Sequence, residues 1–445
     1  MNSTRIILAG LLISAGIGIV TAQSSGDVKP IQRFNGEFQL DGIVDETGWN
    51  AIDPLPLTMH WPVFEGEITE LSEIRISHDD EFIYLSAICF DSDPGEIQGT
   101  SFQRDNWGEE DDQVALILDP YDDNENSLVF AVTVTGSRID AVIKNDAQGE
   151  EPMSMSWNSY WEAATSRNER GWQAEMRIPF SSLRFQEKNG SVEMGLIAYR
   201  YVARKRELNM FPSIPPDWGF WSFTKASRAQ TVSFLGVQNR RPWYISPYIL
   251  AGLGHHYNPD HNGGEDYIPD REFQAGLDIQ HALTDNLNAD FTFHTDFAQV
   301  EADNQVVNLS RYSLFFPEKR KFFLERASIF DFQTELNNNM FYSRRIGIKE
   351  GELIPLWGGI RLVGRIKNWD LGFLDMQSKE TGDFASENFG ILRLRKNVLN
   401  PRSYVGGMVT SRIGLDGRNN MVYGIDGIIN MFRQDYLKVN LAQSW

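Results

Sequence analysis

The feature that most constrains this chain is the alternation of apolar and polar residues along many of its segments. In 172–178, 273–280 and 287–294, single polar residues or glycines separate the apolar ones. Successive side chains of a β-strand point to opposite faces, so a period of two predicts strands with one apolar and one polar face. The chain is therefore expected to be all-β.

The first half of the chain predicts a β-sandwich or jelly roll. Strand-like segments within 31–238 are short, and helix signals are weak there. The segment 71–90 predicts a hairpin, because two strand-like runs flank the turn residues Asp79 and Asp80. Many short strands at this spacing are typical of a sandwich domain, which we place at 31–238.

The second half predicts longer, two-faced strands, with further examples in 360–366, 404–410 and 436–441. Strands of this kind are what a membrane barrel needs, because backbone polar groups in lipid must pair with a neighbouring strand. A soluble sandwich shows the same alternation, so the period alone leaves both open. We predict antiparallel outer-membrane barrel strands over 242–445, where there is room for about ten strands with their connections.

The opening residues predict export. Arg5 precedes an apolar run over 6–20, and Val20-Thr21-Ala22 offers the small residues that signal peptidase requires. A transmembrane helix is the alternative, but the run is shorter than the roughly 20 residues that span a bilayer. We therefore predict a signal peptide over 1–22 and an exported protein of the bacterial outer membrane.

Charge and motifs limit the function classes. The net charge of −20 argues against nucleic acid as a partner. The sequence contains no His-Glu-x-x-His metal motif, no Gly-x-Ser-x-Gly elbow and no phosphate-binding glycine loop. An O-glycosyl hydrolase needs two carboxylates beside the bond that it cleaves, but carboxylates are too abundant here to select a pair. Catalytic residues stay unknown.

Two aromatic segments have the composition of a sugar-binding site. Sugar rings stack their C–H faces on aromatic side chains, and their hydroxyls need polar partners around the rim. Arg104, Asp105 and Trp107 offer this combination in a loop just before a strand, and Trp218 and Trp221 offer it again later. These residues are the candidate ligand-binding residues.

Other notable residues have simpler interpretations. Trp49, Trp161 and Trp172 fall in strand-like or turn patterns and are expected in the core, and the single cysteine, Cys89, is expected to be a small core residue. No metal or cofactor is predicted, and the aspartates of the acidic loops are most simply turn formers. A calcium site among those loops is the alternative. His255, His256 and His261 cluster beside Asp260, but 258–264 is interpreted first as a solvated loop between strands, and metal binding is the alternative there.

Four ordered blocks in the first half, 40–49, 90–93, 112–119 and 172–180, together resemble a family 9 carbohydrate-binding module. The resemblance implies that two tryptophans sandwich a terminal sugar. Trp107 matches the first in position, and Trp218 or Trp221 is the nearest match to the second. The family also uses a carboxylate in the strand over 113–119, where this chain has Ala115.

Two motifs in the second half, 315–325 and 341–347, look like an uncharacterised bacterial outer-membrane family in which such a module precedes a barrel. The barrels of that family are longer than 242–445, so the resemblance implies an incomplete barrel here, and an unusually small barrel is the alternative. The paired phenylalanines around Glu318-Lys319-Arg320-Lys321 would suit a turn at the membrane boundary, and a packed inner loop is the alternative.

Together these patterns predict an envelope protein that binds a poly- or oligosaccharide through a β-sandwich tethered to an outer-membrane barrel in contact with lipid. The alternatives are an O-glycosyl hydrolase and a transport barrel with a soluble plug-like domain.

Overall fold

The computed structural model describes the chain from residue 28 to its last residue, with several gaps. The predicted signal peptide and the predicted loop 258–264 therefore lie outside the described residues, whereas His255 and His256 belong to the strand β15 (Trp243–Tyr257). The gaps are 149–151, 156, 184, 186, 189, 238–242, 258–266, 285, 295–317, 319, 325, 336–337, 350–351, 367, 383, 400–402 and 433–434.

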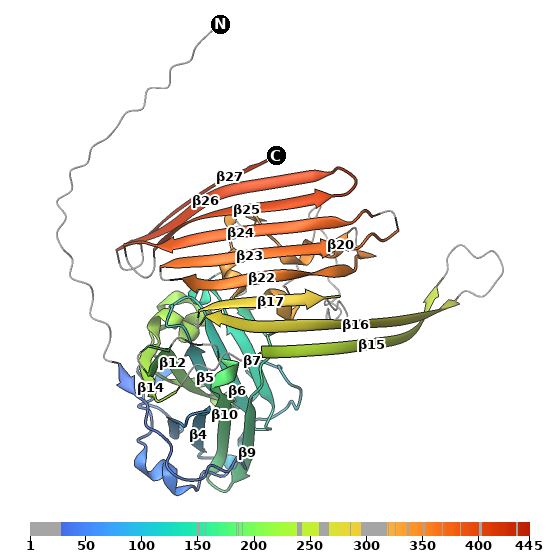
Figure 1. The fold of residues 1–445 in the computed structure, drawn as a ribbon. Helices are drawn as coiled ribbons and strands as arrows, with labels where there is room; N and C mark the ends of the chain where they lie inside the picture. Colours follow the sequence, from blue (N-terminus) through green and yellow to red (C-terminus); the bar gives the residue numbers. More distant parts are fainter. Residues whose placement is uncertain are drawn as a thin grey trace, which may run out of the picture.

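Two sheets form a β-sandwich in the first half, which confirms an all-β fold for this part (Figure 1). The larger sheet has ten strands in the order β1-β14-β12-β5-β6-β7-β8, with β11 and β13 paired to β12 and β2 paired to β13. The smaller sheet has the order β3-β4-β10-β9. The strands are β1 (Lys29–Pro30), β2 (Thr58–Trp61), β3 (Ser72–His78), β4 (Phe82–Phe90), β5 (Gln113–Asp119), β6 (Ser127–Thr133), β7 (Arg138–Ile143), β8 (Met153–Ser154), β9 (Glu162–Asn168), β10 (Gly171–Pro179), β11 (Glu187–Lys188), β12 (Ser191–Val202), β13 (Glu207–Phe211) and β14 (Gln230–Leu235).

The main core lies between these two sheets, where the alternating apolar residues meet. Trp172 pairs with Cys89 and Met176 with Leu85 in the β10–β4 register, and all four side chains are buried. Trp161 is buried in the same core, and Trp49 is buried in a smaller cluster beside it. The expectations for these tryptophans and for the cysteine are therefore confirmed.

The ten-stranded sheet is buried on its other face as well. There the alternate residues of β5, β6, β7 and β12 form a second core cluster, covered by loops and short 3₁₀ helices. The 3₁₀ helices are η1 (Thr47–Ala51), η2 (Pro94–Glu96), η3 (Asn145–Ala147), η4 (Phe180–Ser182), η5 (Ala203–Lys205), η6 (Pro216–Trp218), η7 (Phe220–Thr224), η8 (Ala226–Arg228), η9 (Ala327–Phe330) and η10 (Ser343–Arg345).

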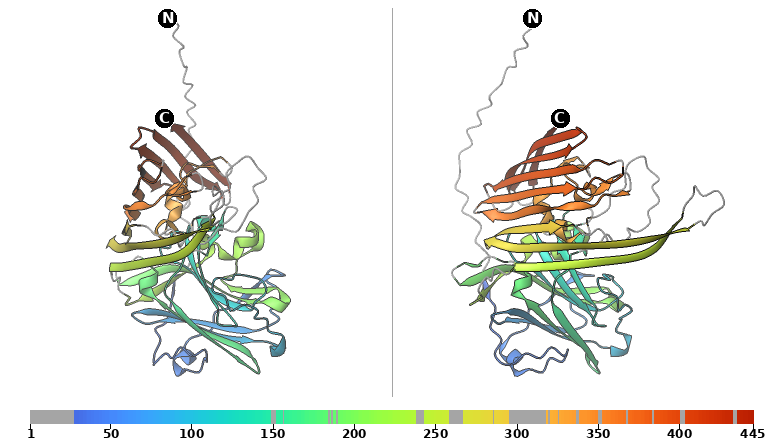
Figure 2. Two further views of the ribbon diagram at one scale, coloured as in Figure 1. Left: turned by 90° about the vertical axis from the view of Figure 1, so that its right-hand side faces the viewer. Right: turned by 45° about the vertical axis from the view of Figure 1, so that its right-hand side comes forward.

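A third sheet of nine strands, each antiparallel to its neighbours, follows in the second half and lies beside the sandwich (Figures 1 and 2). The predicted antiparallel strands are thus confirmed, but within the described residues the sheet is open, with β15 and β27 at its edges. Its strands are β15 (Trp243–Tyr257), β16 (Tyr267–Thr284), β17 (Leu287–Phe293), β22 (Leu356–Ile366), β23 (Trp369–Ser378), β24 (Glu387–Asn397), β25 (Tyr404–Gly414), β26 (Asn419–Phe432) and β27 (Asp435–Ser444).

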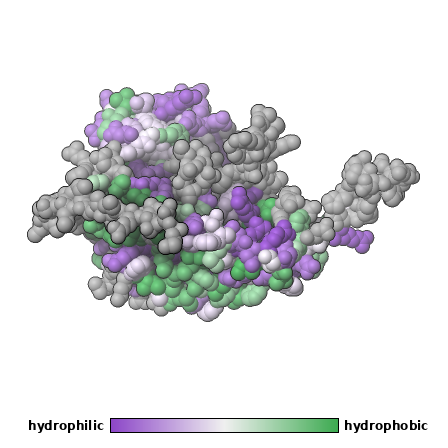
Figure 3. Space-filling view, turned by 90° about the horizontal axis from the view of Figure 1, so that it is seen from above, coloured by the Kyte–Doolittle hydropathy of each residue, from purple (hydrophilic) through white to green (hydrophobic). Residues whose placement is uncertain are grey.

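Along part of the nine-stranded sheet, apolar side chains are exposed and charged side chains are buried. In β24, Leu392 and Leu394 are 42% and 39% exposed, whereas Arg393 and Arg395 are 0% and 4% exposed. The buried arginines form ion pairs across the sheet: Arg395 with Asp370 of the neighbouring strand β23 at 3.1 Å, and Arg393 with Asp426 of β26, two strands away, at 2.6 Å. Hydrophobic residues gather along the lower edge of Figure 3, the side on which this sheet faces the viewer in Figure 1. No helix in the described part of the chain is long and apolar enough to cross a membrane.

A segment between β17 and β22 packs on the inner face of the nine-stranded sheet. Phe322 and Phe323, in the short helix α1, are buried there against residues of β22 to β25. For Phe322 and Phe323 the packed inner loop is therefore observed in place of the turn at the membrane boundary, and Phe315 and Phe316 lie outside the described residues. The segment contains α1 (Lys321–Leu324), β18 (Gln333–Glu335), β19 (Asn338–Asn339), β20 (Ile348–Lys349) and β21 (Glu352–Leu353).

Polar contacts join the sandwich to this inner segment. Ser328 donates a hydrogen bond to the side-chain oxygen of Asn126 at 2.8 Å, and Asn145 donates one to Asp331 at 2.8 Å. Because these side chains are partly buried, their hydrogen bonds hold the two parts of the chain in contact.

Candidate functional site

An aromatic pocket of about 330 Å³ opens beside the second core cluster of the ten-stranded sheet. Its residues come from the end of β2, the loop before β5, the adjoining strands β5, β12 and β13, and the 3₁₀ helix η7. Its lining consists of Trp61, Pro62, Trp107, Gly108, Glu109, Gln113, Tyr199, Tyr201, Arg206, Leu208, Phe220 and Phe223.

Strand register builds the floor of the pocket. Tyr201 lies opposite Gln113 of β5, and two residues earlier Tyr199 lies opposite Ala115. Residues two apart on a strand share a face, so both tyrosine rings project to the same side. Ala115 is small, so the Tyr199 ring has space on that face. The carboxylate of the resembled module has no counterpart at this position, because the residue is alanine.

The hydroxyls of Tyr199 and Tyr201 are buried and have no hydrogen-bond partner among the described residues. Burial raises the pKa of Tyr199 well above its ordinary value, and burial together with the nearby Glu109 carboxylate raises the pKa of Tyr201 to about 12. Both groups therefore stay protonated at neutral pH. A buried hydroxyl without a partner costs roughly 1–3 kcal/mol, which a ligand's hydroxyl groups would recover.

Aromatic rings form the walls of the pocket. Trp107 meets Tyr199 edge-on at 6.4 Å between ring centroids. Trp61 lies 5.4 Å from Phe220 and 5.7 Å from Phe223. Both tryptophans are half-buried, so part of each ring is open to a ligand. Glu109 and Arg206 are exposed and place opposite charges at the rim.

Arg104 and Asp105 lie outside the pocket and have a different role. Arg104 donates a hydrogen bond to the buried carboxylate of Asp140, and Asp105 accepts one from the backbone N–H of Asp140 at 3.1 Å. Burial raises the pKa of Asp140 to about 6, against the opposing effect of the Ser159 backbone N–H and Arg104. These contacts anchor the loop that carries Trp107.

Trp218 and Trp221 pack next to the pocket but do not line it. The guanidinium of Arg228 lies 4.5 Å from the centre of the Trp218 ring, and Trp221 stacks on Phe223 at 6.3 Å. The second tryptophan of the pocket is instead Trp61, which the sequence did not single out.

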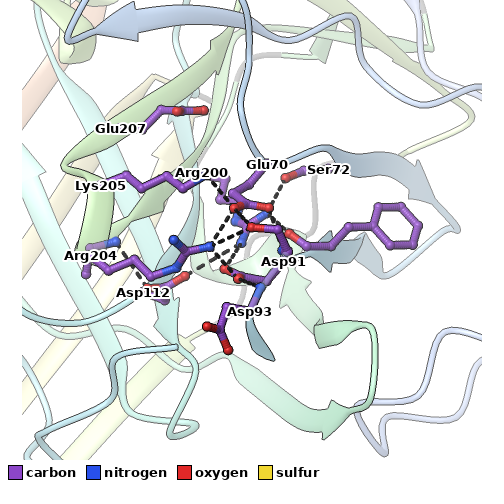
Figure 4. Close-up of polar contacts among 12 residues, drawn as sticks. Glu70, Ser72, Asp91, Asp93, Asp112, Arg200, Arg204, Lys205 and Glu207 are labelled. Carbon is purple, nitrogen blue, oxygen red and sulfur yellow. Dashed lines mark hydrogen bonds and ion pairs between the residues drawn. The ribbon is translucent and has the colours of Figure 1, made fainter. Parts of the chain in front are cut away.

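A buried charge network holds the β12–β13 hairpin on the face of β12 opposite to the two pocket tyrosines (Figure 4). Arg200 is fully buried, and its Nη1 donates to the Ser72 hydroxyl at 2.9 Å and to the backbone carbonyl of Phe90 at 2.7 Å. Its Nη2 lies 3.7 Å from Asp91 and 3.6 Å from Asp112. Since Arg200 sits between Tyr199 and Tyr201 on β12, this network fixes the strand that carries both pocket tyrosines.

The turn after β12 is held by the same network. Arg204 bonds Glu70 at 2.5 Å and Asp91 at 2.6 Å, and Lys205 also bonds Glu70. Burial acts to raise the pKa of Glu70, but the hydrogen bonds from Lys205 and Ser92 outweigh it and lower the pKa to about 2. The next residue along the chain, Arg206, reaches the rim of the pocket.

The described residues hold no group of metal ligands, and one carboxylate lines the pocket. No three His, Cys, Asp or Glu side chains are grouped there as metal ligands. Glu109 is the one carboxylate among the described residues of the pocket lining, whereas glycoside hydrolysis uses two.

Comparisons with known proteins give limited matches. A family described as "Domain of unknown function (DUF5916)" matches residues 244–354, which covers β15 to β21. A crystal structure of a protein proposed to bind carbohydrate, from Bacteroides uniformis ATCC 8492, is 14% identical, with a TM-score of 0.37; the match covers 47% of this chain and 100% of that one. The search of curated proteins found no match. Both family resemblances of the sequence motifs stay predictions.

Proposed function

We propose that this chain binds an oligosaccharide in the aromatic pocket of its β-sandwich. The observation that carries the proposal is the aromatic lining of the pocket, in which the half-buried rings of Trp61 and Trp107 lie beside Tyr199 and Tyr201, whose buried hydroxyls have no partner among the described residues. A sugar is both apolar on its ring faces and rich in hydroxyls, so it satisfies both features at once.

The size of the pocket fits a small part of a glycan. Its volume of about 330 Å³ is near the lower end of the usual range for small-ligand sites, roughly 300–1,000 Å³. One or two sugar rings are therefore expected inside, with the remainder of the chain in solvent. The charges of Glu109 and Arg206 at the rim would contact the sugar that leaves the pocket.

The first experiment is a glycan-binding screen of the full chain in detergent, with hydrolysis products assayed in the same wells. Retention without products supports a binding protein. Product formation would favour the O-glycosyl hydrolase alternative. The absence of binding to any glycan would contradict the proposal.

Tryptophan variants then locate the site. Trp107→Ala and Trp61→Ala should each weaken binding by about 1–3 kcal/mol, because each removes a ring face on which a sugar stacks. Trp218→Ala is the matched control, since Trp218 is a half-buried tryptophan beside the pocket that does not line it. Thermal melts of each variant show whether its fold is intact. A large drop in melting temperature for Trp107→Ala would make Trp107 structural and remove it from the site.

We further propose that the nine-stranded sheet anchors the protein in the outer membrane, through its exposed apolar face. The inverted exposure in β24 supports this, because such a face is stable in lipid and costly in water. Cell fractionation tests it: the intact chain should be recovered with outer membranes, and recovery in the soluble periplasm would contradict it.

A further inference from the structure

A second cavity lies where the sandwich meets the nine-stranded sheet, and it shares no lining residue with the aromatic pocket. We call it the junction cavity. Its volume is about 580 Å³, well within the range of small-ligand sites. Its walls come from the sandwich, from β15 and β16, and from the residues at the end of α1 and the start of η9.

Aromatic rings line part of the junction cavity. Trp157 is buried at its inner side, whereas Tyr160 is 69% exposed at its edge. Tyr121 also lines it, with the guanidinium of Arg326 at 4.2 Å from its ring centre. An exposed tyrosine at the edge of a cavity offers a face on which a sugar can stack.

Polar groups without partners line the same cavity. The hydroxyl of Ser127 and the Nε of Arg326 are buried and have no hydrogen-bond partner among the described residues. The half-buried Lys144 also lines the cavity, and no described side chain forms an ion pair with its ammonium group. Buried donors left unpaired are costly, so a ligand that accepts hydrogen bonds from them is favoured.

The charge balance of the cavity favours an anion. Asp123 is the one acid among the described lining residues, and one of its oxygens already accepts the backbone N–H groups of Glu125 and Asn126. Its other oxygen lies 3.9 Å from Arg326. Among the described residues, one lining acid thus faces two lining cations, and no described acid forms an ion pair with Lys144.

We infer that the junction cavity binds an oligosaccharide that carries carboxylate groups, that is, one built from uronic acids. The carboxylate would be held by Lys144 and Arg326, the ring would stack at Tyr160, and the sugar hydroxyls would bond Ser127. This site is separate from the aromatic pocket, so it stands or falls independently of the function proposed above.

The test titrates the full chain in detergent with tetragalacturonate, with maltotetraose and with acetate. Tetragalacturonate should bind, more weakly as salt is raised, because added ions screen the attraction. Lys144→Gln should weaken its binding about tenfold, the effect of losing a charge-assisted hydrogen bond, and Lys144→Arg should restore much of it. Tyr160→Ala should also weaken it. Lys29→Gln is the matched control, since it removes the same charge from a sandwich lysine that lines neither cavity.

Several outcomes would overturn the inference. Failure of the wild-type chain to bind tetragalacturonate would do so, as would unchanged binding by both Lys144→Gln and Tyr160→Ala. Equal binding of acetate alone would show an anion site without sugar recognition. Loss of tetragalacturonate binding in Trp107→Ala, with Lys144→Gln unaffected, would place the ligand in the aromatic pocket instead. Thermal melts of each variant show whether it is still folded.

Discussion

At the scale of single residues, the two unpartnered hydroxyls give the sharpest prediction. Tyr199→Phe and Tyr201→Phe should each weaken sugar binding by about 0.5–1.5 kcal/mol, the net value of a hydrogen bond. Neither should lower the free energy of unfolding, because the hydroxyl has no partner to lose in the described structure. Titration calorimetry and thermal melts measure the two effects.

The control for these variants is Tyr84→Phe. The Tyr84 hydroxyl donates to Asp79 at 2.6 Å, and neither residue is among the described residues that line the pocket. Its removal should lower stability and leave sugar binding unchanged. If Tyr199→Phe and Tyr201→Phe behave in the same way, the two hydroxyls have protein partners and the site assignment fails.

A second residue-scale prediction concerns acid stability. The pKa of Glu70 is lowered to about 2 in the folded chain, below the ordinary glutamate value. A lowered pKa means that the ionised form stabilises the fold above the unfolded pKa, and that this stability is lost as pH falls from about 4.5 toward 2. The contribution is on the order of 3 kcal/mol. Glu70→Gln should therefore flatten the dependence of unfolding free energy on pH in this window, measured by urea denaturation. An unchanged slope would contradict the assigned role of the Glu70 contacts.

At the scale of elements, the outer face of the nine-stranded sheet can be tested directly. Val409 of β25 is 41% exposed on this face. Val409→Lys should reduce recovery in the membrane fraction, because a lysine near the bilayer midplane costs about 2–4 kcal/mol. Leu235→Lys on β14 changes an exposed apolar residue of the sandwich and should have no effect. Equal recovery of both variants would argue against burial of this face in lipid.

Most strands could be predicted from the sequence, whereas the site could be predicted only in part. Alternation predicts strands such as β10 and β16 because burial of one face imposes the period of two. Trp107 was found because a tryptophan among charged residues is conspicuous. Trp61 was missed because it reaches the pocket only through pairing with Leu208, far along the chain, and no local pattern encodes that pairing.

Arg104 and Asp105 show the converse problem. Their charged neighbours in the sequence suggest a sugar site. In the structure both residues form hydrogen bonds with Asp140 of β7 instead. A buried carboxylate needs partners, so the nearest cation and the loop backbone are drawn to it. Sequence spacing alone could not reveal that Asp140 is buried next to this loop.

At the scale of the whole molecule, sugar binding and membrane anchoring should be separable. Every described residue that lines the aromatic pocket belongs to the sandwich, and none belongs to the nine-stranded sheet. Val409→Lys should therefore retain full affinity for the sugar in detergent while membrane recovery falls. Loss of both together would show that the sheet supports the pocket.

The most direct measurement of the central claim is a crystal structure of the chain with the best-bound oligosaccharide of the screen. A sugar ring should lie between Trp61 and Trp107, with hydroxyls bonded to Tyr199 and Tyr201. A sugar bound elsewhere, with the aromatic pocket empty, would contradict the account.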